Sequence, residues 1–477
     1  MTVSDVIYRV ARALAPITLL VSLGGCATFS EDGGFGAVEA EVRDKLGAQA
    51  KWHRDDDQRE TAKAAVATLL GEELTVETAM QLALLNNPGL QADYANLGLQ
   101  EAEMVRAGRL PNPGFSFGKT SSGDAQEIER GLHFNLLALL MLPVRFGIEE
   151  ERFEAAKLSA IAMTIDTAMR ARNAFYEAVA ARQAVEYAEQ VVEAADASRQ
   201  LMARMSAVGN SSRLEHTREQ LFHAEATAAL AATKQRADGA REALIRTLGL
   251  WGTQTTDLRL PTRLPELPGA PRELKDIEQT AIAQRMDVRQ AKRSLDALTA
   301  NLQLNEAIGF INVLEVGPTQ VRERADEVHV SDGYEIAFEI PIFDFGQVKA
   351  AQAEALYNQA VERVRETAVN ARSEVRSAYL SYRTAYDLTR HYRDEVVPLR
   401  KRISDEQLLR YNGMLIGVFE LIADAREQVM SINTYFDTLR QFWLADTALQ
   451  TAMLIGNAPA ISLNAAMASG GDGDGGH

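Results

Sequence analysis

The sequence of 477 residues is poor in cysteine, in aromatic residues and in positive charge. Its one cysteine, Cys26, excludes an intrachain disulfide. Aromatic residues make up 6% of the chain although hydrophobic residues make up 46%, because alanine supplies much of the apolar share. The formal net charge is −16, whereas nucleic-acid-binding proteins present basic patches. Nucleic acid is therefore not an expected partner.

Long hydrophobic runs are also missing. No stretch after the N-terminal leader reaches the roughly 20 apolar residues that a transmembrane helix requires. In the leader, Arg9 and Arg12 precede an apolar stretch, residues 13–23, that is too short to span a bilayer. We predict a signal peptide at residues 1–25, and any further membrane contact must then use β-strands.

The single cysteine stands directly after this leader, behind Leu23-Gly24-Gly25. Small residues before a cysteine resemble the lipobox of bacterial lipoproteins, which predicts palmitate on Cys26 and a lipidated N-terminal segment at residues 26–73. Ala27 follows where an aspartate would suggest inner-membrane retention, so the outer membrane is favoured. The alternative is an ordinary signal peptide with an incidental cysteine.

What the chain does have is an internal repeat. Leu84–Ala92 matches Ala283–Ala291, and Phe146-Gly147 pairs with Phe345-Gly346 at the same spacing. Further on, Gly209 pairs with Gly413. Each half is predicted to contain a helix, two strands, a very long helix, a turn and a long helix. The predicted divisions are a first repeat at 74–249, a Pro-rich linker at 250–272, a second repeat at 273–456 and a disordered Gly/Asp-rich tail at 457–477.

The long helices give the strongest physical signal. Residues 148–208 contain neither Gly nor Pro, and residues 347–412 are interrupted by Pro398 alone. Small or apolar residues recur every seven positions, as at Ala171, Ala178 and Val185, which is the coiled-coil signature. Sixty such residues give roughly 90 Å of helix, a length suited to bridging two compartments.

Four short strands are expected, at about 111–122, 131–143, 309–321 and 334–342. The clearest is Tyr334–Ile342, where apolar and other residues alternate as in a membrane β-barrel strand. This alternation predicts that Glu335 and Glu339 face a wet lumen. Leu136–Leu142 is continuously apolar, and a buried helical turn is the competing interpretation there. Four strands cannot close a barrel, so the chain must oligomerise.

Taken in order, several motifs over roughly 74–456 resemble the TolC family of outer-membrane efflux proteins. They are Leu74-Thr75-Val76, Ala79, Ala83, Asn87-Pro88, Leu90, Arg109–Pro113, Pro341–Gly346, Val397-Pro398-Leu399, Tyr411-Asn412-Gly413 and Glu420-Leu421-Ile422.

The resemblance implies a mainly α fold with a small β part. Three copies would form an α-helical barrel of long antiparallel hairpins and share a 12-stranded transmembrane β-barrel, with four strands from each chain. It further implies an outer-membrane channel that extends into the periplasm and works with a periplasmic adaptor and an inner-membrane pump, expected to be proton-driven. Outer-membrane lipid is the remaining expected partner, and the cargo would be drugs or metal ions.

The turns between the long helices are the best candidate sites. In the resembling family such tips contact the adaptor, which singles out Val208, Gly209, Asn210, Ser211, Tyr411, Asn412, Gly413 and Met414; plain turn chemistry is the alternative. Glu420 and Asp424, four apart on one helical face, are candidates for an acidic ring at the pore aperture. A solvated helix face would explain the same two carboxylates.

Two motifs that resemble an enzyme or metal site do not have the spacing that such a site requires. Gly114–Thr120 resembles a P-loop, but its glycines are too close together and it lies in a predicted strand. His216 and His223, seven apart on a helix, are separated by roughly 10 Å along the axis and cannot bind one metal ion directly. We expect no catalytic activity and no cofactor or metal. Two alternatives stay open: the outer-membrane duct of a type I protein secretion system, and a periplasmic coiled coil without a pore.

Overall fold

The computed structural model describes residues 27–122, 125–308, 313–324 and 327–456, which form two compact units. The first unit contains residues up to Gly36, Ala95–Leu158 and Arg289–Thr367, and the second contains Ala37–Tyr94, Ser159–Val288 and the chain from Ala368. The predicted signal peptide, Cys26 and the predicted tail lie outside the described residues. The mostly helical fold with a small antiparallel sheet that the sequence predicted is confirmed.

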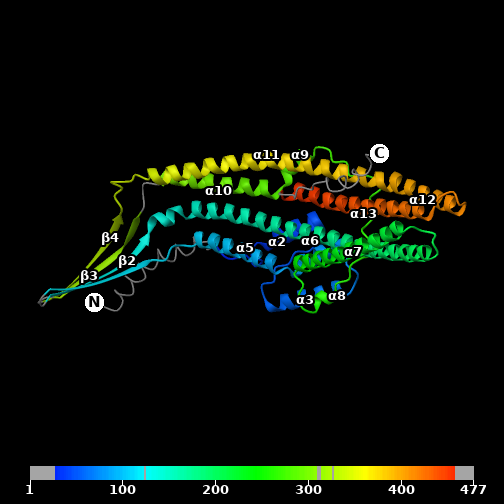
Figure 1. Ribbon diagram of the computed structural model, residues 1–477. Helices are drawn as coiled ribbons and strands as arrows, with labels where there is room; N and C mark the ends of the chain where they lie inside the picture. The colour runs from blue at the N-terminus through cyan, green and yellow to red at the C-terminus, as the bar shows by residue number, and fades with distance from the viewer. Residues whose placement is uncertain (1–26, 123–124, 309–312, 325–326, 457–477) are drawn as a thin grey trace. The chain divides into compact units, whose positions relative to one another are not determined.

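The first unit is organised around a four-stranded antiparallel sheet in the order β1-β2-β3-β4 (Figure 1). Its strands are β1 (Gly114–Ser122), β2 (Ala125–Asn135), β3 (Leu314–Arg324) and β4 (Val328–Phe338). Two hairpins, one from each half of the sequence, meet where β2 pairs with β3. Four helices continue from the sheet: α5 (Pro88–Ala107), α6 (Leu136–Ala207), α10 (Met286–Ile308) and α11 (Gln347–His391).

The second strand differs from the prediction of 131–143. It ends at Asn135, whose Oδ1 accepts a hydrogen bond from the backbone N–H of Ala138 at 2.7 Å and caps the start of α6. The continuously apolar residues from Leu136 are therefore helical, because they lack the alternation of a half-buried strand and follow a good N-cap.

The fourth strand was also predicted too late, at 334–342. It ends at Phe338, before Pro341, which has no N–H to donate to a strand pair. Glu335 lies within β4, whereas Glu339 follows its end. The N–H of Glu339 still donates to the carbonyl of Val313 at 3.4 Å, and the lumen-facing positions of Glu335 and Glu339 stay predictions.

The second unit is helical. Besides parts of α6 and α11 it contains α2 (Phe35–Leu46), α3 (Asp56–Leu70), α4 (Val76–Asn86), α7 (Arg213–Leu248), α8 (Gln254–Asp257) and α9 (Ile277–Gln284). It ends with α12 (Val397–Asn412) and α13 (Val418–Leu454). None of the described helices combines the length and the apolar character needed to cross a bilayer.

Pro398 does not break its helix. A π-helical turn, η1 (Tyr392–Val396), joins α11 to α12 and places the proline in the first turn of α12. The wider turn accommodates a residue that has no N–H for the preceding carbonyl, so the chain continues in the same helical course.

The core of the second unit lies where α4, α6, α7, α11 and α13 pack around the segment between α8 and α9. Leu258, Leu260, Leu264 and Leu267 of this predicted Pro-rich linker are all buried in it. The carbonyl oxygens of Pro265 and Pro268 accept hydrogen bonds from Trp443 and Tyr386 at 2.9 and 3.1 Å. The segment is irregular, as expected, but its leucines make it part of the core.

Candidate functional site

The first helical hairpin ends in a turn between α6 and α7. The backbone N–H of Gly209 donates to the carbonyl of Ser206 at 3.1 Å, and that of Asn210 donates to Met205 at 2.8 Å. This pair of bonds is a Schellman motif, in which the first donor occupies the left-handed region. Gly209 has φ 80°, which glycine adopts without steric cost. Val208 beside it is 71% exposed, so the turn presents an apolar side chain to solvent.

The second hairpin ends between α12 and α13 in the same way. The N–H of Met414 donates to Tyr411 and that of Leu415 to Arg410, both at 2.9 Å. Met414 has φ 58°, so it, and not Gly413, is the structural counterpart of Gly209. The pairing of Gly209 with Gly413 in the sequence repeat is thus wrong by one residue. The Met414 side chain is 93% exposed.

The eight tip residues predicted from the sequence therefore fall at the two hairpin ends of the second unit. Asn210 and Ser211 precede Ser212, which caps α7 by accepting from the N–H of Glu215, while the Glu215 carboxylate accepts from the Ser212 N–H at 2.7 Å. That hydrogen bond lowers the pKa of Glu215 below its ordinary value. Leu415, 77% exposed, is a ninth tip residue that sequence reasoning missed.

The two candidate aperture carboxylates differ in environment. Glu420 lies in the first turn of α13 and is exposed. Asp424, one turn further, is 8% exposed, and its Oδ2 has no hydrogen-bond partner in the described part of the chain. The two carboxylates lie four positions apart on α13, as predicted, but only Glu420 is exposed. Their role at the aperture stays a prediction.

Close to Asp424 lies a polar cluster that the sequence did not reveal. Glu219 on α7 is buried and accepts hydrogen bonds from Arg426 Nη2 on α13, at 2.7 and 2.8 Å, and from Ser198 Oγ on α6, at 2.7 Å. The Arg426 guanidinium also stacks 3.6 Å from the ring centroid of Phe222. Ser198, Phe222 and Arg426 line a cavity of about 560 Å³. This helix-bridging cluster ties three helices together near the hairpin ends.

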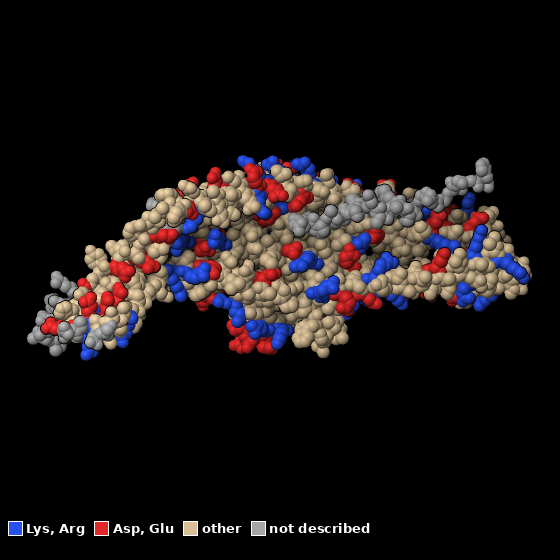
Figure 2. Space-filling view, turned by 60° about the vertical axis from the view of Figure 1, so that its left-hand side comes forward, with Lys and Arg blue, Asp and Glu red and all other residues tan. Residues whose placement is uncertain are grey.

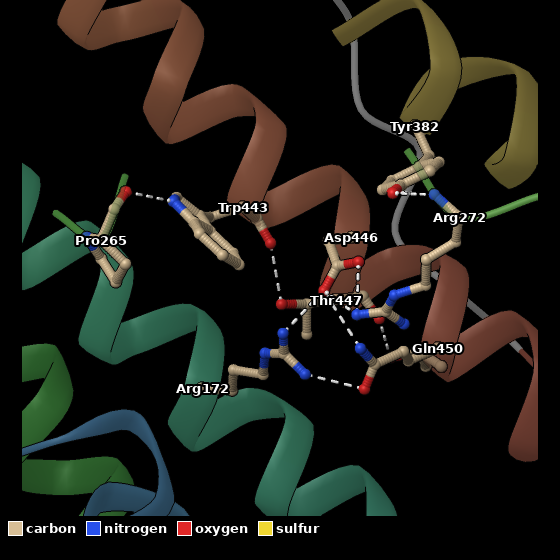
Figure 3. A network of polar contacts seen from close by, with 9 residues as sticks. Arg172, Pro265, Arg272, Tyr382, Trp443, Asp446, Thr447 and Gln450 are labelled. Atoms are coloured by element: carbon tan, nitrogen blue, oxygen red, sulfur yellow. Dashed lines mark hydrogen bonds and ion pairs between the residues drawn. The ribbon is translucent and has the colours of Figure 1, made fainter. Parts of the chain in front are cut away.

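A larger polar network lies far along α13 from the hairpin end (Figure 3). Asp446 has a 2% exposed side chain and binds Arg172 Nη2 of α6 at 2.6 Å and Arg272 Nη2 at 3.0 Å. Gln450 connects to both Arg172, at 2.7 Å, and Asp446, at 3.0 Å. The backbone N–H of Arg272 donates to the Tyr382 hydroxyl at 2.9 Å. Burial raises the pKa of Tyr382.

In the half of the sheet nearer the helices, one face is apolar and the other is polar. Strand register places Phe115 opposite Leu132, Phe134 opposite Val316, and Val316 opposite Ile336. Because paired residues project to the same side, these apolar residues share a face with Phe117 and Phe338. The other face carries Ser116, His133, Glu315 and Glu335, and the His133 ring contacts Ser116 Oγ at 2.8 Å.

The remaining sequence candidates are the two histidines of α7 and the P-loop-like segment. In the described part of the chain, no group of three or more His, Cys, Asp or Glu side chains could hold a metal ion. His216 contacts Gln220 at 3.1 Å, and His223 lies 3.8 Å from Asp196. The P-loop-like segment lies inside β1. On the face shown in Figure 2, acidic and basic side chains are interspersed.

Comparison with known proteins adds a family match over part of the chain. Residues 277–403 match the family described as outer membrane efflux protein. Protein CyaE of Bordetella pertussis is 26% identical over 348 residues, which cover 65% of this chain and 71% of CyaE.

Solved structures show the same fold. A membrane protein from Pseudomonas aeruginosa aligns with a TM-score of 0.67 at 17% identity, over 79% of this chain and 92% of its own. CusC aligns with a TM-score of 0.65 at 18% identity, over 81% of this chain and 94% of its own. The recognition made from the sequence is confirmed, because this chain carries an outer membrane efflux protein domain and has the fold of the TolC-family outer-membrane channels.

Proposed function

We propose that this chain is the outer-membrane channel of a tripartite efflux system, a passive conduit that carries drugs or metal ions from the periplasm to the exterior. The observation that carries the proposal is the sheet with one apolar and one polar face, in a chain whose residues 277–403 match an efflux family. The family consists of channels and ducts, so no catalytic step is assigned to the chain.

The sheet supports membrane insertion by its two faces. Its apolar face would contact lipid, and its polar face, with His133 and Glu335, would line the lumen. One chain supplies four described strands, whose two edges would be left unpaired in lipid. A homotrimer, with 12 strands, would remove those edges. Homologues in this family are trimeric channels that work with adaptor and pump partners, and we extend that assembly to this chain.

The hairpin ends support docking of a periplasmic adaptor. Val208, Met414 and Leu415 are apolar and largely exposed, and both turns hold them by the same hydrogen-bonding pattern. Apolar side chains at a rigid turn can be buried by a partner with little further loss of conformational entropy. The adaptor would link the channel to an inner-membrane, proton-driven pump that supplies the energy.

Glu420 is a better candidate than Asp424 for the acidic ring at the pore aperture. Glu420 is exposed near the hairpin end, where three copies would form a ring that favours cations. Asp424 is buried in this conformation and would face the lumen only after α13 rotates or shifts. Lipidation of Cys26 and anchoring in the outer membrane complete the proposal, together with the division into signal peptide, two repeats, linker and tail.

The duct of a type I protein secretion system is the second candidate, and the similarity to CyaE favours it. Deleting the gene distinguishes the two. Sensitivity to toxic compounds would support the efflux channel, whereas retention of a polypeptide normally found outside the cell would support the secretion duct. The test common to both is purification from outer membranes, with measurement of oligomer mass and of conductance in planar bilayers. A soluble periplasmic monomer would contradict both, and a trimer without conductance would favour a structural coiled coil.

A further inference from the structure

The first unit contains a basic cleft next to the sheet. It has a volume of about 630 Å³ and lies between the end of α5, the segment leading into β1, the first turns of α6 and the end of α10. Four arginines and two glutamates line it: Arg106, Arg109, Arg145, Arg152, Glu103 and Glu149. In a chain with a net charge of −16, this is a local excess of positive charge.

Two of the four arginines are already neutralised. Arg106 pairs with Glu103, and Arg152 Nη1 lies 2.6 Å from Glu149 Oε1. Arg109 and Arg145 are exposed and have no carboxylate within ion-pair distance among the residues that the structure describes. The cleft therefore offers two guanidinium groups to an anion from outside. Guanidinium forks bind phosphate oxygens in pairs, which makes phosphate the best-matched anion.

The surroundings of the cleft are apolar. Leu110, Leu140 and Val144, which belong to the same segments, are exposed. The segment that carries Arg109 leads directly into β1, whose Phe115 and Phe117 lie on the apolar face of the sheet. A free phosphate ion would make no favourable contact with these apolar side chains, whereas a phospholipid would place its acyl chains against them.

The N-terminal segment gives a separate indication that the cleft lies near the membrane surface. Ala27, the residue after Cys26, packs so closely on Gly108 that a Cβ on this glycine would lie 2.6 Å from the Ala27 Cβ and 2.7 Å from Phe146 Cδ2. The Arg109 guanidinium lies 5.9 Å from the ring centroid of Phe29. The chain just after the predicted lipid anchor is thus held beside the cleft, and an anchored cysteine places it at the level of the lipid headgroups.

We propose that Arg109 and Arg145 bind the phosphate of an anionic phospholipid, of the phosphatidylglycerol class, in the membrane leaflet that holds the N-terminal anchor. This inference rests on the proposed outer-membrane location. The bound lipid would fill the junction between helices and sheet and fix the depth of the channel in the bilayer.

Native mass spectrometry of the delipidated oligomer tests this directly. Dioleoyl phosphatidylglycerol, dioleoyl phosphatidylcholine and inorganic phosphate are each titrated into detergent-solubilised protein. The variants are Arg109→Gln with Arg145→Gln, the same pair changed to Lys, and Arg363→Gln as the control, an exposed arginine of the same unit on α11. Wild type and control should retain phosphatidylglycerol in preference to phosphatidylcholine. The double Gln variant should lose about tenfold or more of that affinity, and the Lys pair should fall between.

Three results would overturn the inference. Equal retention of both lipids by wild type would remove the charge preference, and binding of inorganic phosphate at equal concentration to phosphatidylglycerol would assign the site to a free anion. Loss of the oligomer in the double Gln variant, with the control intact, would assign the cleft to a contact between subunits. If the wild type is a conducting trimer, any of these results refutes the lipid site alone, whereas a wild type that is a soluble monomer refutes the proposed function itself.

Discussion

The two halves of α13 differ in how firmly they are held. In the half nearer its C-terminus, eleven residues from Thr438 to Ala452 are buried, whereas in the half that starts at the hairpin end Asp424 alone is buried. The neighbouring α12, which is described along its whole length, buries no residue. The same helix thus leads from a packed core into a segment whose remaining faces are free to contact other copies or to move.

The polar contacts of the two halves also differ. The core half has Asp446 with two arginines, Gln450 and the aromatic packing of Tyr382, Phe442 and Trp443. The hairpin half has the helix-bridging cluster around Glu219. Buried side-chain atoms without a hydrogen-bond partner occur in both halves, for example Arg172 Nε in the core half and Asp424 Oδ2 in the hairpin half. Because the hairpin half buries far fewer residues of α12 and α13, it is the part from which an opening movement should start.

The largest expected effect is in the core half. Asp446→Ala removes the carboxylate shared by Arg172 and Arg272 and leaves the Arg172 side chain, 11% exposed, without its counter-charge. We expect a loss of about 3–5 kcal/mol in the free energy of unfolding. Thermal unfolding in detergent measures it, beside Asp405→Ala, an exposed residue on α12, as the control. Equal melting temperatures for the two variants would show that the network does not hold the core.

A smaller loss is expected in the hairpin half. Glu219→Gln removes the charge that faces Arg426, and the free energy of unfolding should fall by about 2 kcal/mol. Because the cluster ties α13 to α6 and α7, the channel should also open more often in planar bilayers. Glu225→Gln, exposed on α7, serves as the control. If the variant loses stability but its open probability does not change, the cluster does not control the opening movement.

Sequence reasoning could predict the long helices because alanine and valine recur every seven residues over a stretch without glycine or proline. It could not predict the burial of Glu219, since that depends on which helix packs over it. The end of β2 was open to prediction, because Asn135 is a good N-cap before an apolar run. The place of Met414 was not, because glycine is the usual residue in a left-handed turn and Gly413 stands next to it.

The two turns themselves should respond in opposite directions. Gly209→Ala places a Cβ at φ 80°, where no other atom lies within 4 Å, so only backbone strain of about 1 kcal/mol is added. Met414→Gly removes the same kind of strain and should stabilise the second hairpin by a similar amount, reduced by the greater freedom of glycine in the unfolded chain. Hydrogen exchange of the two turns measures both. Destabilisation by both changes would contradict the equivalence of the turns.

The smallest effect concerns the N-terminal segment of the first unit. Asp32 accepts hydrogen bonds from the backbone N–H groups of Gly36 and Gly34, at 2.7 and 2.9 Å, and the first of these chiefly holds its pKa below the ordinary 3.8. A lowered carboxyl pKa stabilises the folded segment fully above the unfolded value, and the contribution is lost as pH falls through the folded value.

Limited proteolysis of this segment should therefore be independent of pH above about 5 and should accelerate below the ordinary pKa of Asp32. Asp32→Asn should be cleaved faster at neutral pH and should show less of this acid dependence. If the variant keeps the full acid dependence of the wild type, another group controls the segment.

Single-channel conductance of the purified oligomer in planar bilayers tests the central claim most directly, with Glu420→Ala and Asp424→Ala compared in the same preparation. We expect a trimer with a small, cation-selective conductance, whose selectivity weakens with Glu420→Ala more than with Asp424→Ala, because Glu420 is exposed at the hairpin end and Asp424 is buried. A trimer that does not conduct, or one whose selectivity depends on Asp424 and not on Glu420, would contradict that claim.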